Sequence, residues 1–127
     1  MVRRSRRVGI IFGVVLLGAL SGVEGAEPLR LRVSPEAMLA PGFVTVRASI
    51  EADAENRLLE VTATSADFYR SSTVEMDGAQ APRLSVFEFR GLPPGDYEFA
   101  GRLIGVHGPR ATVFRLARVV PIGGSLR

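Results

Sequence analysis

The chain has 127 residues, a length that indicates a single domain. It contains no cysteine and one histidine, His107, which excludes disulfide bonds, thiol catalysis and metal sites built from cysteines or from several histidines. The net charge is +3, but four of the 16 basic and one of the 13 acidic residues precede residue 26, which leaves twelve of each sign in the remainder. This neutral remainder argues against a nucleic-acid-binding domain and against a polybasic membrane-surface domain.

The first 25 residues have the three parts of a secretory signal peptide. Four arginines lie within residues 1–7, thirteen apolar or glycine residues follow at 8–20, and small residues come next. Cleavage after Gly25 is expected, because it places Val23 and Gly25 at the −3 and −1 positions. An uncleaved anchor is the alternative, although the apolar run is shorter than the roughly 20 residues of a membrane span. In both cases the domain lies outside the cytoplasm, because the arginines keep the N-terminus inside. The leader and the exclusive use of arginine as the basic residue indicate a bacterial protein of the periplasm or the extracellular space.

Short apolar runs separated by proline and glycine predict many strands after the leader. The run 43–50 shows the pattern best, because Val44, Val46 and Ala48 alternate with polar residues at the period of a half-buried strand. Seven strands are predicted in chain order: 29–33, 43–50, 57–64, 72–76, 84–89, 97–104 and 111–120.

One helical turn is predicted between the first two strands, over residues 34–39. Ser34 is a suitable cap, and Pro35 occupies the first helical position. The segment is too short for more than one turn. A helix over 52–60 is the other possibility, but residues 57–64 fit a strand better.

The turns between the predicted strands carry a resemblance to a known group of domains. The segment Gly91–Phe99, with the sequence GLPPGDYEF, resembles the turn into a late strand of bacterial immunoglobulin-like and carboxypeptidase-regulatory-like modules. The turn at Pro41-Gly42 and the hairpin at Asp77–Pro82 are similar to the same group. The resemblance rests on these short motifs within residues 29–120, and it implies a fold rather than a function.

The fold expected from the strand pattern and from this resemblance is all-β. It is a seven-stranded Greek-key immunoglobulin-like sandwich over residues 26–122, preceded by a signal-peptide helix over 1–25 and followed by a flexible tail at 123–127. The cysteine pair and the buried tryptophan of antibody domains are absent from the sequence. The Tyr97 hydroxyl is expected to cap a loop, as in a tyrosine corner.

The predicted topology brings the loops 51–56, 77–82 and 105–110 to one end of the sandwich. These loops carry carboxylates and the single imidazole, which are ligands of divalent cations. The candidate metal ligands are Asp53, Glu55, Asp77 and His107. A solvated acidic loop end is the other interpretation, because the spacing does not match a calcium-binding loop. A metal- or small-ligand-binding periplasmic carrier is therefore the alternative function.

The opposite end of the sandwich carries an aromatic and basic triplet. Phe68, Tyr69 and Arg70 lie in the predicted loop 65–71, and tyrosine and arginine are frequent anchors of binding surfaces. The sequence therefore predicts partner-binding residues here. In the alternative interpretation Phe68 turns inward and closes the end of the core.

The last predicted strand has apolar residues on both sides. Those on one side are Phe114, Leu116 and Val120, and those on the other side are Val113, Ala117 and Val119. A strand of this kind is covered on both faces, which indicates a partner chain over the face outside the core. Val113 and Arg115 are the candidate contact residues of this strand, and scattered surface apolar residues are the alternative.

The sequence contains no nucleophile elbow, no phosphate-binding glycine loop and no pair of carboxylates with glycosidase spacing. It predicts an exported, non-enzymatic module without a cofactor. The expected partner is another envelope or extracellular protein or a second copy of the chain, and a structural role in the envelope is equally consistent. Nucleic acid is not expected as a partner, and membrane contact is expected only through an uncleaved leader.

Overall fold

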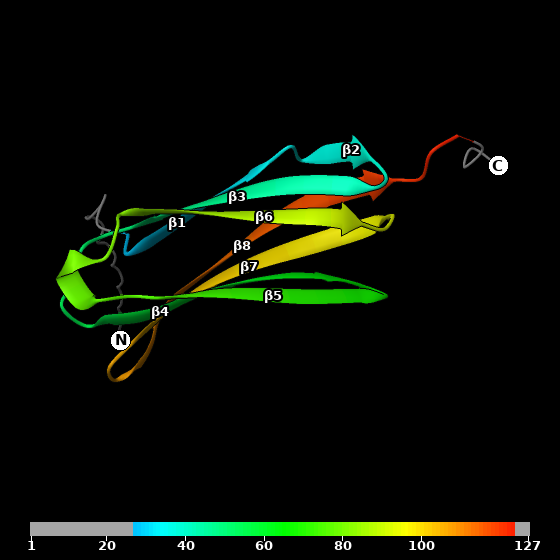
Figure 1. Ribbon diagram of the computed structural model, residues 1–127. Coiled ribbons are helices and arrows are strands. Elements are labelled where there is room, and N and C mark those ends of the chain that lie inside the picture. Colours follow the sequence, from blue (N-terminus) through cyan, green and yellow to red (C-terminus); the bar gives the residue numbers. More distant parts are fainter. Residues whose placement is uncertain (1–26, 124–127) are drawn as a thin grey trace, which may run out of the picture.

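The computed structural model describes residues 27–123, which form eight strands and one short 3₁₀ helix (Figure 1). The predicted signal peptide and residues 124–127 of the predicted tail lie outside the described residues. The described residues contain no helix of the length and apolarity that a membrane span requires. The elements are β1 (Leu29–Ser34), β2 (Ala37–Leu39), β3 (Gly42–Ile50), β4 (Asn56–Ser65), β5 (Phe68–Glu75), η2 (Gly78–Gln80), β6 (Leu84–Leu92), β7 (Gly95–Gly105) and β8 (Gly108–Val120).

The strands form two sheets that lie face to face (Figure 1). The first sheet has three strands in the order β1-β3-β6, and the second has five in the order β2-β8-β7-β4-β5. All neighbouring strands are antiparallel except β2 and β8. The chain crosses between the sheets five times, in the connections β1–β2, β2–β3, β3–β4, β5–β6 and β6–β7. The prediction of an all-β, two-sheet fold is therefore confirmed.

The core lies between the two sheets and follows from alternating side chains. In β3 every second residue is buried, and the cross-strand partners in β1 and β6 alternate in the same way. Phe89 of β6 and Phe99 of β7 meet edge to face across the core, with their ring centroids 5.4 Å apart. Such aromatic pairs add about 0.5–1.5 kcal/mol to the burial of their rings. Period-two patterning in both sheets thus produces one continuous apolar layer.

The predicted helical turn at residues 34–39 is wrong, because residues 37–39 form strand β2. This strand runs parallel to the end of β8, and backbone hydrogen bonds extend the pairing from Ala40 to Val120 and from Arg118 to Glu36. A single helical turn gains few internal hydrogen bonds. The edge of β8 offers hydrogen-bond partners to the backbone N–H and C=O groups of residues 36–40, and this pairing determines their conformation.

The strand predicted at residues 72–76 begins earlier, at Phe68, so the structure has no long loop at 65–71. β4 and β5 form a hairpin whose turn is Ala66 and Asp67, with Ser65 opposite Phe68. The residues of β5 are nearly all exposed, because β5 lies at the edge of the five-stranded sheet and packs extensively only against β4. A strand with neither face covered lacks the apolar alternation by which strands are recognised in a sequence.

The Tyr97 hydroxyl caps a loop, as expected, and the loop is the turn before its own strand. The Tyr97 ring is buried in the core, and its hydroxyl donates to the carbonyl oxygen of Pro93 at 2.6 Å. This bond ties the turn between β6 and β7 to β7.

We expect Tyr97→Phe to lower the free energy of unfolding by about 1–2 kcal/mol. The substitution removes the hydroxyl and leaves the Pro93 carbonyl without its partner, while the buried ring stays in place. Urea denaturation measures the effect. Tyr69→Phe is the matched control, because Tyr69 is exposed. Equal stability of the two variants would contradict a role for the Tyr97 bond.

Candidate functional site

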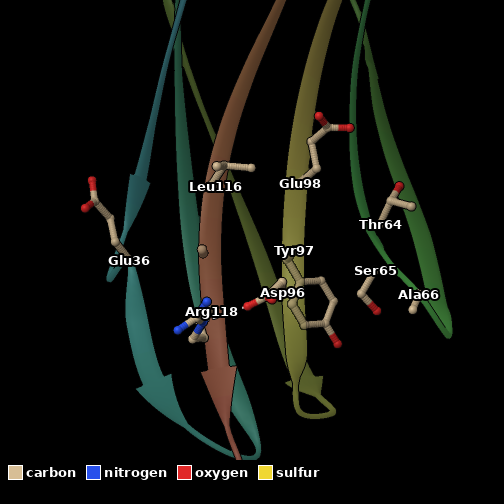
Figure 2. Close-up of a pocket in the computed structure, with 10 residues that line it drawn as sticks. Glu36, Thr64, Ser65, Ala66, Asp96, Tyr97, Glu98, Leu116 and Arg118 are labelled. Atoms are coloured by element: carbon tan, nitrogen blue, oxygen red, sulfur yellow. Dashed lines mark hydrogen bonds and ion pairs between the residues drawn. The ribbon is translucent and has the colours of Figure 1, made fainter.

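The outer face of the five-stranded sheet carries a hollow with a volume of about 680 Å³ (Figure 2). It lies at the end of the sheet where β7 begins and β8 ends, beside the turn between β4 and β5. Its lining residues are Glu36, Thr64, Ser65, Ala66, Asp96, Tyr97, Glu98, Leu116, Ala117 and Arg118.

Exposed apolar side chains stand beside this hollow on the same face. The strand register places Leu116, Glu98, Thr64 and Tyr69 in one row across β8, β7, β4 and β5, a distance of about 14 Å. Phe114 stands two residues before Leu116, in the neighbouring row. The exposed fractions are 64% for Tyr69, 53% for Phe114 and 72% for Leu116. We call these three residues the apolar triad.

The hollow contains more acidic than basic groups. Arg118 pairs with Asp96, the Nε–Oδ1 distance being 2.7 Å. Glu36 and Glu98 also line the hollow, and neither has an ion-pair partner among residues 27–123. The face therefore combines an apolar patch with uncompensated negative charge.

The structure separates the members of the predicted triplet in β5. Phe68 is partly buried and meets the ring of Tyr97 edge to face at 5.9 Å, so it closes the end of the core. Arg70 lies over the Phe68 ring at 5.0 Å and donates from Nη1 to the carbonyl oxygen of Arg90 at 2.7 Å, which links the two sheets. Tyr69 points to the outer face. Alternation along the strand thus places Tyr69 alone of the three in the apolar triad.

We expect alanine substitutions at the two neighbouring aromatic positions to have opposite consequences. Phe68→Ala lowers the free energy of unfolding by about 1–3 kcal/mol, less than a fully buried phenylalanine, because its ring is only partly covered. Tyr69→Ala changes stability by no more than about 0.5 kcal/mol, because the side chain is exposed. Chemical denaturation of both variants checks this. A larger loss of stability for Tyr69→Ala than for Phe68→Ala would contradict the assignment of Phe68 to the core and of Tyr69 to the outer face.

The two predicted contact residues of β8 do not stand on the outer face. Val113 is partly buried and packs against the core. Arg115 donates from Nε to the carbonyl oxygen of Leu31 at 3.1 Å and so reaches the three-stranded sheet. The exposed apolar residues of this strand are Phe114 and Leu116. The sequence separates the two faces, but it does not tell which face points to the core.

The predicted metal candidates lie at the other end of the sandwich, as expected from the topology. Backbone hydrogen bonding from Val106 to Glu55 joins two of the three loops. Asp53 accepts from the backbone N–H of Glu55 at 2.8 Å and pairs with Arg110, the Oδ2–Nη2 distance being 3.1 Å. In the part of the chain that the structure describes, no group of three or more acidic or histidine side chains is placed to hold a metal ion, and Asp77 and His107 join no such group.

Arg110 is a residue that the sequence reading missed. Its Nη1 donates to Oδ1 of Asn56 at 2.6 Å, and Asn56 is only 1% exposed. The Nδ2 of Asn56 in turn donates to the carbonyl oxygen of Glu51 at 3.1 Å. The network holds the loop before β4 against β8. Asp53, Asn56 and Arg110 are therefore engaged in fastening the loop before β4.

Comparisons with known proteins identify a fold and no family. No family model and no curated protein matches the chain. A solved structure, a superoxide reductase (neelaredoxin) from Ignicoccus hospitalis, is similar with a TM-score of 0.55 and 15% sequence identity, over 73% of this chain and 80% of that one. At this identity the likeness shows the all-β sandwich fold alone.

Proposed function

We propose that the chain is an exported, non-enzymatic module of immunoglobulin-like type that binds another envelope or extracellular protein through the outer face of its five-stranded sheet. The observation that carries the proposal is the apolar triad of Tyr69, Phe114 and Leu116, exposed together on one face. Side chains of this size gain most when a partner covers them. Tyrosine and phenylalanine are also enriched at the centres of protein interfaces.

The strand arrangement supports the immunoglobulin-like assignment. Counted in chain order without β2, the strands give one sheet of the first, second and fifth strands and another of the seventh, sixth, third and fourth. The grouping of the first, second and fifth strands in one sheet and of the seventh, sixth and third in the other supports an immunoglobulin-like Greek key. The fourth strand pairs with the third here, whereas it joins the first, second and fifth in the constant-type domain. The hydrogen bond from Tyr97 to Pro93, four residues upstream, corresponds to the tyrosine corner of those domains.

The charges around the triad favour a basic partner surface. Glu98 stands between Leu116 and Tyr69 in the cross-strand row, and Glu36 lies at the border of the same hollow. A partner with an apolar centre and arginine or lysine at its rim would complement both features. Such rim charges chiefly raise the association rate and select the partner, while the apolar centre holds the complex together.

A non-enzymatic role is supported by the inventory of reactive side chains. The structural neighbour's name describes a reductase, and a similar activity here would have to be built with one histidine and no cysteine. Imidazole and thiolate are the usual protein ligands of redox-active iron and copper. The residues of this chain therefore fit a binding module better than a redox enzyme.

The experiment that tests the proposal uses the full-length chain with a C-terminal tag, produced in its native host and recovered from the cell envelope. The proposal predicts a mature chain that begins at Ala26, and one partner protein in stoichiometric amount. Mass spectrometry of the intact chain and of the bound protein reads both results together. Recovery from the cytoplasm with residues 1–25 still attached would contradict export, and recovery of the chain alone would contradict the binding role.

A further inference from the structure

The outer face of the three-stranded sheet gathers arginines that lack acidic partners. Arg32 of β1 stands directly opposite Arg47 of β3, and Arg30 lies two residues before Arg32 on the same face. Among the described residues, neither Arg32 nor Arg47 forms an ion pair. Arg30 has only a loose contact with Glu27, at 4.0 Å between two exposed groups. Like charges directly opposite in a strand pair destabilise it, so this arrangement is unfavourable without a counter-charge.

A fourth arginine approaches this group from the other sheet. Arg115 of β8 donates from Nε to the Leu31 carbonyl oxygen at 3.1 Å and from Nη1 to the Phe114 carbonyl oxygen at 2.8 Å. These two bonds fix the guanidinium and leave the hydrogens of Nη2 free to bind a ligand. Arg115 is therefore held in position before a ligand arrives, which lowers the entropy lost on binding.

The four arginines line one hollow, with a volume of about 550 Å³. Ser49 adds a hydroxyl, and Glu36 is the one carboxylate in the lining. The hollow thus carries four positive groups against one negative group. Its volume lies within the usual range of small-molecule sites, roughly 300–1,000 Å³.

We propose that this arginine hollow binds a phosphate-bearing ligand. Guanidinium groups match the geometry of phosphate oxygens and contact them through paired hydrogen bonds. A phosphate placed between Arg32 and Arg47 would also supply the counter-charge that this strand pair lacks. The overall neutrality of residues 26–127 is compatible with this local excess of positive charge, because balancing carboxylates lie elsewhere, among them Asp96 and Glu98 at the hollow of the five-stranded sheet.

Two sources offer this chemistry, a membrane lipid headgroup and a soluble phosphate compound. Exposed aliphatic residues lie next to the arginines, since Val86 stands opposite Arg47 and Leu84 opposite Ser49. Their exposed fractions are 52% and 51%. At a lipid surface the arginines would bind headgroup phosphates while the neighbouring apolar side chains contact the lipid. A soluble ligand would need the hollow alone. The two sources share the phosphate, and the experiment separates them.

The test measures binding of the mature protein, recovered from its host, to two probes. Isothermal titration with inorganic pyrophosphate represents the soluble source, and co-sedimentation with phosphatidylglycerol vesicles, against phosphatidylcholine vesicles, represents the lipid source. The test variant is Arg32→Gln with Arg47→Gln, which keeps long polar side chains. The control variant is Arg102→Gln with Arg118→Gln, which removes the same charge from the outer face of the five-stranded sheet.

We expect the wild type and the control variant to bind at least one probe, with an affinity that falls as salt is added. The test variant should bind that probe at least about tenfold more weakly, because charge-assisted hydrogen bonds to two guanidinium groups are lost. Binding to vesicles alone identifies the headgroup, and binding to pyrophosphate identifies a soluble ligand. Absence of binding to both probes, or equal weakening in the two variants, would overturn the proposal. The protein-binding role is tested separately, because the apolar triad lies on the outer face of the five-stranded sheet, whereas Arg32 and Arg47 lie in the three-stranded sheet.

Discussion

Replacing Arg110 by methionine is expected to lower the free energy of unfolding by about 2–3 kcal/mol. The substitution leaves Oδ1 of Asn56 without its donor, and a buried acceptor that loses its partner costs about 1–3 kcal/mol. The ion pair with Asp53 is lost as well, although its partial exposure limits that contribution to a fraction of a kcal/mol. Methionine keeps an aliphatic side chain over Gly105, against which the Arg110 stem lies closely, so the change isolates the guanidinium.

Urea denaturation of the Arg110→Met variant measures this effect, with Arg118→Met as the matched control. Arg118 also lies in β8 and also pairs with an aspartate, but both members of that pair are largely exposed. Exposed pairs of this kind contribute about 0–1 kcal/mol. A similar loss of stability in both variants would show that the buried network at the loop end is no stronger than a surface pair.

The second large effect concerns binding rather than stability. We expect the double substitution Phe114→Ser and Leu116→Ser to weaken association with the partner by roughly 700-fold or more. Two interface anchors each contribute about 2 kcal/mol or more when a partner covers them, and 1.4 kcal/mol corresponds to a factor of ten. The free energy of unfolding should change by no more than about 0.5 kcal/mol for each substitution, because both side chains are exposed.

The three-stranded sheet offers a matched control for this variant. Leu84 and Val86 are exposed to a similar degree, and they also lie two residues apart on an outer face. Leu84→Ser with Val86→Ser should leave recovery of the protein partner unchanged. Titration of each purified variant with the recovered partner gives the affinities. Equal weakening by both double substitutions would place the protein interface elsewhere than on the five-stranded sheet.

Much of the fold follows from local patterning. β3 and β7 have the period of two that marks a strand with one buried face, and their predicted ranges lie within the observed strands. β2 was missed, and the prediction left out the first four residues of β5, because pairing partners and not their own sequences determine these segments. β2 completes the edge of β8, and β5 is an exposed edge strand held by a two-residue hairpin.

The candidate sites depend on information that a single strand does not contain. In β8 both faces carry apolar residues. The packing of the two sheets decides that Val119 faces the core and that Leu116 lies on the outer face. The arginine hollow depends on register, because Arg32 and Arg47 become neighbours only when β1 pairs with β3. Tyr97 was the exception, since the resemblance of its turn motif predicted a loop cap, and the structure identifies the Pro93 carbonyl oxygen as its partner.

The most direct test of the proposed binding role is site-specific photo-cross-linking in the native host. A photoreactive amino acid replaces Leu116 on the five-stranded sheet in one strain, and Val86 on the three-stranded sheet in another. Both positions are exposed, so the reagent is presented equally well. We expect one defined protein adduct from position 116, formed outside the cytoplasm, and no protein adduct from position 86. A protein adduct from position 86 alone, or none from either position, would contradict the proposed binding role.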